Sequence, residues 1–227
     1  MNMNKSIDLG KYFDYTNLRN NLTFEEVKKL CDEAIEFGFY GLCVHPYYVQ
    51  EVVSILKSSN VKVVSVADFP YGASLLNSRW QQMEELVKSA VDEIDLVMSI
   101  PLFIGKKFDL FEKDIEMAVQ ICHSHNVKLK VIIETGLLLP EEISLATRIL
   151  CNYNVDFVKT STGVISRGAS FEDISIIKEN ISGATKIKAS GGIKTLEQVQ
   201  KFIELGVARI GASGAVSIVR EYEELIK

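Results

Sequence analysis

Apolar residues along the chain follow two spacings, and each spacing predicts a different kind of element. From Thr23 to Gly38 they recur at helical intervals, with Thr23 and Glu26 in the positions of a capping box and Gly38 where a helix ends. Residues 39–44, FYGLCV, then give a short continuous apolar run, which is typical of a buried strand. A helix followed at once by a strand is thus the first repeat of the chain.

The same alternation continues to the end of the sequence. The predicted strands, counting YFDYT near the start, are residues 12–16, 39–44, 61–67, 93–98, 128–134, 155–160, 185–190 and 207–212. The predicted helices run through residues 23–38, after Pro46, through 76–91 and 111–122, from Pro140, from Ser170, from a second capping box at Thr195 and Gln198, and up to Lys227. No linker or low-complexity segment interrupts this order.

Eight strand–helix units in 227 residues are typical of a single (β/α)8 TIM barrel of the α/β class. We expect residues 1–227 to form one catalytic barrel domain. An open, doubly wound sheet is the alternative, because a count of strands does not show that the sheet closes. No glycine-rich dinucleotide-binding fingerprint follows the first strand.

Alternation within the strands assigns side chains to the inside of such a barrel. In EIDLVM and TKIKAS the alternate apolar positions suit the surrounding helices, which turns Asp95 and Lys188 inward. In YFDYT the residues Asp14 and Thr16 share a face opposite the aromatic residues, and in GLCV Cys43 opposes its apolar neighbours. These strands therefore point polar groups toward a common interior.

The sixth strand, VDFVKT, places Lys159 at the end of an otherwise apolar run. Val155 and Phe157 share its face, so this strand alone does not show whether that face points inward. If it does, Asp95, Lys159 and Lys188 lie together near the C-terminal ends of the strands, where barrel enzymes keep their chemistry. A structural ion network is the alternative, although two amines close together are difficult to explain as stabilising.

Such a cluster suits nucleophilic chemistry by an amine. An ordinary lysine has a pKa of about 10.4, and a second ammonium about 6 Å away would lower that pKa by roughly 2 units. Lys188 would then keep Lys159 partly neutral near pH 7, free to attack a carbonyl and form a Schiff base. Asp95 is the nearest group to move protons.

The last two strand ends predict an anion site. The segments KASGGI and RIGASG place small residues with accessible N–H groups where helices begin, which is the phosphate position of many barrels; these residues are Gly191, Gly192, Gly211, Ser213 and Gly214. The sequence therefore predicts a phosphorylated small-molecule substrate.

Composition excludes several other classes of function. A net charge of -5 argues against nucleic-acid and anionic-membrane partners. The sequence has no signal-like segment at its start and no apolar stretch that approaches about 18 residues, so a cytoplasmic protein is expected. Four dispersed cysteines without a CxxC pair, and two histidines spaced i and i+2 in HSHN, predict neither a metal site nor a cofactor.

These motifs together resemble those of the deoxyribose-phosphate aldolases. VKTSTG resembles the Schiff-base motif, with Lys159 as the nucleophile; KASGGI resembles the second-lysine motif at Lys188, and DEIDLV the acid/base motif at Asp95. FDYTNL, GLCVHPYYV and DFPYGAS are similar to the ends of the family's first three strands. Residues that the resemblance places in the substrate pocket are Asp14, Thr16, Cys43, Phe69, Pro70, Gly72 and Thr162.

The resemblance implies reversible cleavage of 2-deoxy-D-ribose 5-phosphate to glyceraldehyde 3-phosphate and acetaldehyde in deoxynucleoside breakdown, without a metal, by a homodimer. The chain departs from the pattern in residues 98–107, MSIPLFIGKK, and 164–170, VISRGAS, where Arg167 could add charge near the phosphate. Two other functions stay open: another phosphate-binding barrel enzyme, such as an isomerase or a different lysine aldolase, and a sugar-phosphate binder without catalysis.

Overall fold

The computed structural model describes residues 7–227, in which eight parallel strands close into a barrel in chain order, with β1 paired to β8. The strands are β1 (Phe13–Thr16), β2 (Gly41–Val44), β3 (Lys62–Ala67), β4 (Glu93–Val97), β5 (Lys128–Ile132), β6 (Phe157–Lys159), β7 (Lys186–Ser190) and β8 (Arg209–Ala212). The predicted TIM barrel is confirmed, and the pairing of β1 with β8 excludes an open sheet. Residues 1–6 lie outside the described residues. They belong to the predicted domain of residues 1–227 and to the N-terminal stretch in which no signal segment is predicted.

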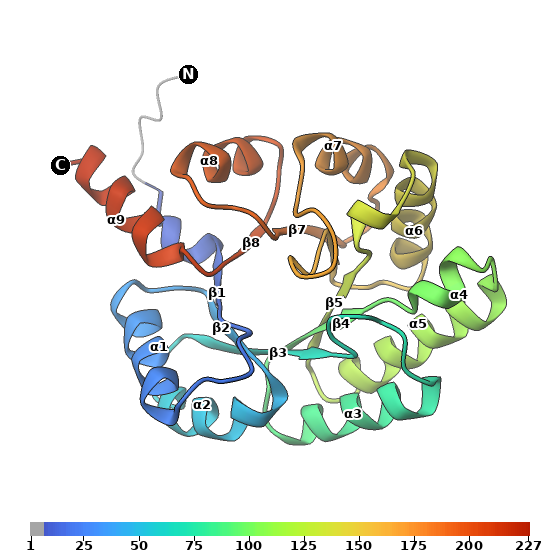
Figure 1. Cartoon of the computed structure of the whole chain (residues 1–227), viewed down its shortest axis with the longest axis horizontal. Helices are drawn as coiled ribbons and strands as arrows, with labels where there is room; N and C mark the ends of the chain where they lie inside the picture. The colour runs from blue at the N-terminus through green and yellow to red at the C-terminus, as the bar shows by residue number, and fades with distance from the viewer. Residues whose placement is uncertain (1–6) are drawn as a thin grey trace.

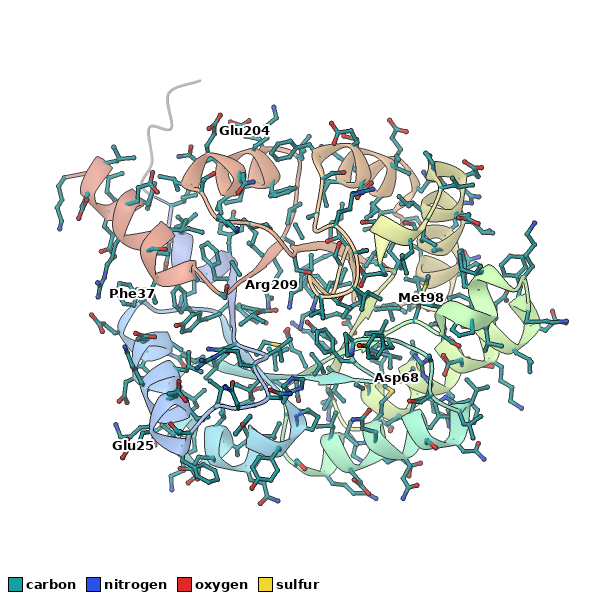
Figure 2. The ribbon with its side chains drawn as sticks, viewed as in Figure 1. Glu25, Phe37, Asp68, Met98, Glu204 and Arg209 are labelled. Carbon is teal, nitrogen blue, oxygen red and sulfur yellow. The ribbon has the colours of Figure 1, made fainter. Side chains whose placement is uncertain are left out.

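Helices surround the barrel as an outer ring (Figure 1). They are α1 (Phe24–Glu36), α2 (Val49–Leu56), α3 (Leu76–Lys88), α4 (Ile100–Ile104), α5 (Phe108–His123), α6 (Pro140–Asn152), α7 (Phe171–Asn180), α8 (Leu196–Glu204) and α9 (Ala215–Leu225). Short 3-10 turns also occur at η1 (Leu9–Tyr12), η2 (Pro46–Tyr48) and η3 (Thr135–Leu137). Figure 2 shows Arg209 near the middle of the ring and Glu25 and Glu204 on its outside.

The helix-start signals in the sequence are confirmed. The Thr23 side chain accepts a hydrogen bond from the Glu26 N–H, and the Glu26 carboxylate accepts one from the Thr23 N–H. Thr195 caps α8 in the same way, and Pro140 occupies the first turn of α6. Capping satisfies N–H groups that have no partner inside a helix, so these residues fix where the helices begin.

Most predicted boundaries differ from the structure by one or two residues, and three differences are larger. The helix predicted over residues 111–122 begins three residues earlier, at Phe108. The predicted helix over residues 76–91 ends at Lys88, because Ala90 adopts a left-handed φ of 60° that a helix cannot continue through. Residues 98–107 contain the short helix α4, which the sequence did not predict; Pro101 lies in its first turn.

Apolar side chains fill two separate regions. The larger core lies between the strands and the helices, where the outward residues of the strands pack, such as Leu96 and Ile187. Inside the barrel a small apolar cluster contains Cys43, Val64 and Val66. The interior also holds several buried charged groups, which is unusual for a barrel core and marks the region of the site.

No helix in residues 7–227 is long and apolar enough to cross a bilayer. Over the same range, no three His, Cys, Asp or Glu side chains are grouped so that they could hold a metal ion.

Candidate active site

The register of the strands brings the predicted catalytic residues together. Lys159 on β6 pairs with Lys188 on β7, so the two lysines lie side by side at the same level of the barrel. Asp95 on β4 pairs in the same way with Lys130 on β5. All four side chains are buried inside the barrel. The predicted inward direction of Lys159, which its own strand could not decide, is therefore correct.

The Asp95 carboxylate is the centre of this cluster. The Nζ atoms of Lys159 and Lys188 each lie 2.7 Å from its Oδ2 atom. Lys130 Nζ lies 2.7 Å from the other oxygen, Oδ1. Three amines thus surround one carboxylate, and each is held by a charge-assisted hydrogen bond.

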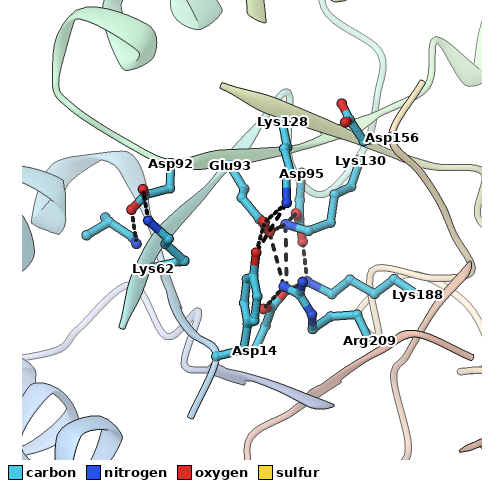
Figure 3. A network of polar contacts seen from close by, with 12 residues as sticks. Asp14, Lys62, Asp92, Glu93, Asp95, Lys128, Lys130, Asp156, Lys188 and Arg209 are labelled. Carbon is cyan, nitrogen blue, oxygen red and sulfur yellow. Dashed lines mark hydrogen bonds and ion pairs between the residues drawn. The ribbon is translucent and has the colours of Figure 1, made fainter. Parts of the chain in front are cut away.

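Further charged side chains, Asp14, Glu93 and Arg209, contact this cluster (Figure 3). Asp14 Oδ2 lies 2.5 Å from Lys188 Nζ, and its Oδ1 atom lies 2.7 Å from Arg209 Nη1. Glu93 contacts both Lys130 Nζ, at 2.6 Å, and Arg209 Nη1, at 3.2 Å. Lys188 is thus held by both Asp14 and Asp95, which leaves little freedom in its position, whereas the contact of Lys159 is with Asp95.

Sequence reasoning did not include Lys130, Glu93 or Arg209, although the signal was present. Lys130 stands between Leu129 and Val131, and Arg209 precedes Ile210; these apolar residues pack in the core beneath the helices, the same alternation that turned Lys188 inward. Glu93 lies two residues before Asp95 on β4, and therefore on the same face.

The pKa of the Lys159 amine is lowered from its ordinary value. Burial is the largest cause; the Asp95 carboxylate opposes the shift, and the Lys188 ammonium adds to it. The predicted influence of Lys188 is therefore correct in direction but second to burial. A neutral Lys159 amine can still donate its hydrogen bond to Asp95.

The neighbouring groups keep their charges. Burial acts to lower the pKa of Lys188, but Asp14 and Asp95 raise it above the ordinary value. For Asp95, burial acts to raise the pKa, yet Lys130, Lys159 and Lys188 together lower it well below its usual range. Asp95 is thus an ionised carboxylate and Lys188 an ammonium at neutral pH.

The number of charged groups in the network favours a neutral Lys159. The network contains four basic side chains and three carboxylates: Lys130, Lys159, Lys188, Arg209, Asp14, Glu93 and Asp95. If every group were ionised, one positive charge would be left in excess inside the barrel. A neutral Lys159 removes that excess, which is the arrangement that costs least in a buried environment.

A cavity of about 210 Å³ opens above the network. It is lined by Thr16, Leu18, Phe69, Lys159, Thr162, Gly163, Val164, Ser190, Gly191, Gly192, Ile193, Lys194, Gly211, Ala212 and Ser213. Most of these residues follow β6, β7 and β8, so the cavity is at the C-terminal end of the barrel, as predicted. Of the three lysines that contact Asp95, only Lys159 contributes to the lining.

Seven of the twelve residues predicted for the pocket line this cavity, and five do not: Asp14, Cys43, Pro70, Gly72 and Gly214. The seven are Thr16, Phe69, Thr162, Gly191, Gly192, Gly211 and Ser213. Asp14 lies below the cavity in the charge network, and Gly214 precedes α9 outside the lining. Cys43 is fully buried beside the network, where burial raises the pKa of its thiol to about 11, so it is a protonated, apolar neighbour.

Glycines shape the cavity in two ways. Gly191 and Gly192 have φ angles of 85° and 72°, which other residues rarely adopt, and this exposes the backbone of the turn to the cavity. A Cβ atom at Gly211 would lie 3.2 Å from Lys188 Cε and 3.0 Å from Ser190 Cβ. The absence of a side chain at Gly211 therefore provides the room that the Lys188 side chain occupies.

The basic group at the rim of the cavity is Lys194, which the sequence reasoning did not include. Arg167, which was expected near the phosphate, instead forms an ion pair with Asp173 in the first turn of α7. It is absent from the cavity lining because that pairing directs its guanidinium toward the helix.

Comparison with known proteins identifies the family of this chain. The profile of the DeoC/LacD family aldolases matches residues 8–222. The chain belongs to this aldolase family. Among curated family members, it is 40% identical to the deoxyribose-phosphate aldolase of Aciduliprofundum boonei, over 95% of this chain and 97% of the relative. It is 39% identical to that of Staphylococcus carnosus, over 96% and 98% of the two chains.

Solved structures of the family have the same fold. An aldolase named QR15 superposes with a TM-score of 0.91 at 35% identity, over 97% of this chain and 99% of the other. The deoxyribose phosphate aldolase of Aeropyrum pernix superposes with a TM-score of 0.88 at 26% identity, over 96% and 92%. The chain is therefore an aldolase-family enzyme, and the resemblance in its motifs is confirmed.

Proposed function

We propose that the enzyme reversibly cleaves 2-deoxy-D-ribose 5-phosphate to D-glyceraldehyde 3-phosphate and acetaldehyde, through a Schiff base on Lys159. One observation carries this proposal: of the two amines that share Asp95 Oδ2, only Lys159 lines the cavity, and its pKa is lowered. An amine that is both neutral and accessible is what attack on an aldehyde requires. The names of the 39–40% identical relatives support the same substrate.

In the proposed reaction, the Lys159 nitrogen attacks the C1 aldehyde of the open-chain sugar and forms a carbinolamine. Loss of water gives a protonated imine. The C3 hydroxyl then loses its proton and the C2–C3 bond breaks, so that its electron pair moves toward the imine nitrogen. Glyceraldehyde 3-phosphate departs, and a two-carbon enamine stays on Lys159.

The enamine carbon then takes up a proton, and water releases acetaldehyde and the free amine. Asp95 is the proposed proton carrier for these steps, either directly or through water, because its carboxylate contacts Lys159. Lys188 is proposed to maintain the ionised state of Asp95 and to lower the pKa of Lys159.

The phosphate is proposed to bind at the rim, on the backbone after β7 and β8. Gly191, Gly192 and Ser213 line this side of the cavity, and Lys194 supplies a positive charge there. Bare N–H groups in left-handed turns are suited to an anion. This chemistry uses no metal or organic cofactor.

The cellular role follows from the proposed reaction. We propose breakdown of deoxynucleosides in the cytoplasm, by one barrel domain that acts as a homodimer. The solved relative from Aeropyrum pernix is described as tetrameric. Light scattering at known concentration measures the mass of the assembly, and a mass of one or four chains would contradict the dimer.

Borohydride trapping with 2-deoxyribose 5-phosphate, followed by peptide mass mapping, tests the proposed function. The expected result is a reduced two- or five-carbon adduct on Lys159 that is lost in Lys159→Leu. An adduct on Lys188 would reverse the roles of the two lysines. Substrate binding without any adduct would contradict the imine mechanism.

A further inference from the structure

Glu134 is a fully buried carboxylate that the proposed reaction does not use. It lies just after β5, with a φ of 53° and a ψ of 61°. A left-handed backbone is uncommon for a residue other than glycine, and it persists only where the surroundings impose it. The position of this side chain is therefore maintained by specific contacts.

Those contacts are with the segment that follows Lys159. Residues 160–170 connect β6 to α7 and are called the β6–α7 loop. The Thr162 N–H donates to Glu134 Oε2 at 2.9 Å, and the Ser166 hydroxyl donates to Oε1. A carboxylate accepts hydrogen bonds and donates none when ionised, so each of its oxygens fixes one donor of the loop.

The same loop forms one wall of the cavity. Thr162, Gly163 and Val164 line it, three to five residues after Lys159. Gly163 also lies against Gly191: a Cβ added at Gly163 would lie 3.1 Å from Gly191 Cα. The placement of this wall consequently decides the width of the cavity on the side of the proposed phosphate site.

We propose that Glu134 is a positioning residue that holds the β6–α7 loop against the cavity and so sets the affinity for the phosphate end of the substrate. This inference rests on the proposed function. Glu134 lies under the loop, outside the cavity lining, and it acts through Thr162 and Ser166. Its removal should weaken substrate binding more than it slows the chemistry at Lys159.

The first test compares Glu134→Ala with Glu142→Ala. Glu142 is a matched control because it also accepts a backbone N–H, that of Leu139 at 2.8 Å, but it caps α6 and does not contact the loop. Hydrogen–deuterium exchange is measured over residues 160–170 without substrate. Faster exchange in Glu134→Ala alone is expected, and equal exchange in both variants would overturn the anchoring.

Kinetics then separate positioning from general damage. For Glu134→Ala we expect about a tenfold higher Michaelis constant for 2-deoxyribose 5-phosphate with kcat changed by less than about twofold. With unphosphorylated 2-deoxyribose, kcat/KM should change by less than about twofold. A loss that is equal for both substrates, or confined to kcat, would overturn the proposed link to the phosphate.

Glu134→Gln should restore both measurements, because its amide oxygen can accept from Thr162 and its NH2 group can donate to Ser166. If Glu134→Ala does not fold, Ser166→Ala is tested in its place. Faster exchange in the loop together with a raised Michaelis constant supports the inference, and unchanged values of both overturn it. Failure of the wild-type chain to form an imine would overturn the proposed function instead. The exchange data would still show whether Glu134 anchors the β6–α7 loop.

Discussion

Lys159 and Lys188 donate to the same oxygen atom, Oδ2 of Asp95, each over 2.7 Å. The two amines are nevertheless unlike, because Lys188 also contacts Asp14 and has a raised pKa, whereas the pKa of Lys159 is lowered. One carboxylate therefore contacts a lysine whose pKa is raised and a lysine whose pKa is lowered. The two lysines should therefore differ in their role in catalysis and in their titration.

Lys159→Leu should lower kcat for sugar cleavage by more than about a thousandfold, because it removes the proposed nucleophile. The fold should remain, since the substitution removes an amine and leaves three basic groups for three carboxylates in the network. A coupled assay of glyceraldehyde 3-phosphate release measures the loss, and circular dichroism measures the fold. Lys201→Leu, on the exposed face of α8, is the control and should keep its activity.

The pH dependence of kcat/KM should report the pKa of Lys159, because only the free amine attacks. The rate should rise with pH through that pKa. Lys188→Met removes an ammonium that lowers the pKa of Lys159, so the acidic limb of the profile should move to higher pH by about one unit. A limb that stays in place, or moves to lower pH, would show that another group titrates.

The same shift predicts a change of stability with pH. Between the lowered pKa of Lys159 and its unfolded value of about 10.4, the unfolded chain binds a proton that the folded chain does not. This group's contribution to the free energy of unfolding should therefore rise with pH across that range. Urea unfolding at several pH values measures the difference in free energy of unfolding between wild type and Lys159→Leu. A difference that does not change with pH would contradict the prediction.

Lys130→Met should destabilise the fold by about 3 kcal/mol, because Asp95 and Glu93 would lose a buried cation that contacts both. Lys62→Met is the matched control: it removes a lysine 2.9 Å from Asp92 on the exposed surface, and should change the unfolding free energy by less than about 1 kcal/mol. Urea unfolding compares the two, and equal effects would mean that the buried network adds no stability.

Gly211→Ala should reduce kcat by about tenfold or more while the protein still folds, because its Cβ would displace the Lys188 side chain. The loss should appear in kcat for both phosphorylated and unphosphorylated sugar, since Lys188 acts at the imine end. Thermal unfolding checks that the variant is folded. A kcat equal to that of the wild type would show that the barrel accommodates the methyl group without moving Lys188.

The sequence predicts the barrel, and it predicts that the catalytic candidates lie near the C-terminal ends of the strands, because both features depend on local patterns. Alternation oriented Asp95 and Lys188 correctly, but it could not orient Lys159. The reason is Phe157, an aromatic residue on the inner face of β6 whose ring lies 5.3 Å from the Arg209 guanidinium. With an apolar residue inside the barrel, both faces of β6 carry apolar side chains, so alternation does not show which face points inward.

Other features depend on contacts between distant segments and left no periodic signal. The Arg167 side chain was expected at the cavity, but its ion pair with Asp173 is visible only once α7 is placed. The sequence pattern predicts Glu134 as the last residue of a strand, whereas β5 ends at Ile132 and Glu134 turns beneath the β6–α7 loop. Such positions are set by tertiary packing rather than by the pattern of the segment.

The unequal access to the two lysines has a consequence for chemical labelling. A small amine-reactive compound that enters the cavity meets Lys159 in its wall, while Lys188 is fully buried beneath it and held by Asp14 and Asp95. The lowered pKa of Lys159 also favours it as the target over Lys188, whose pKa is raised. A single lysine could therefore carry a reporter group or an inhibitor at a defined place in the enzyme, without prior mutation of the other lysines in the barrel.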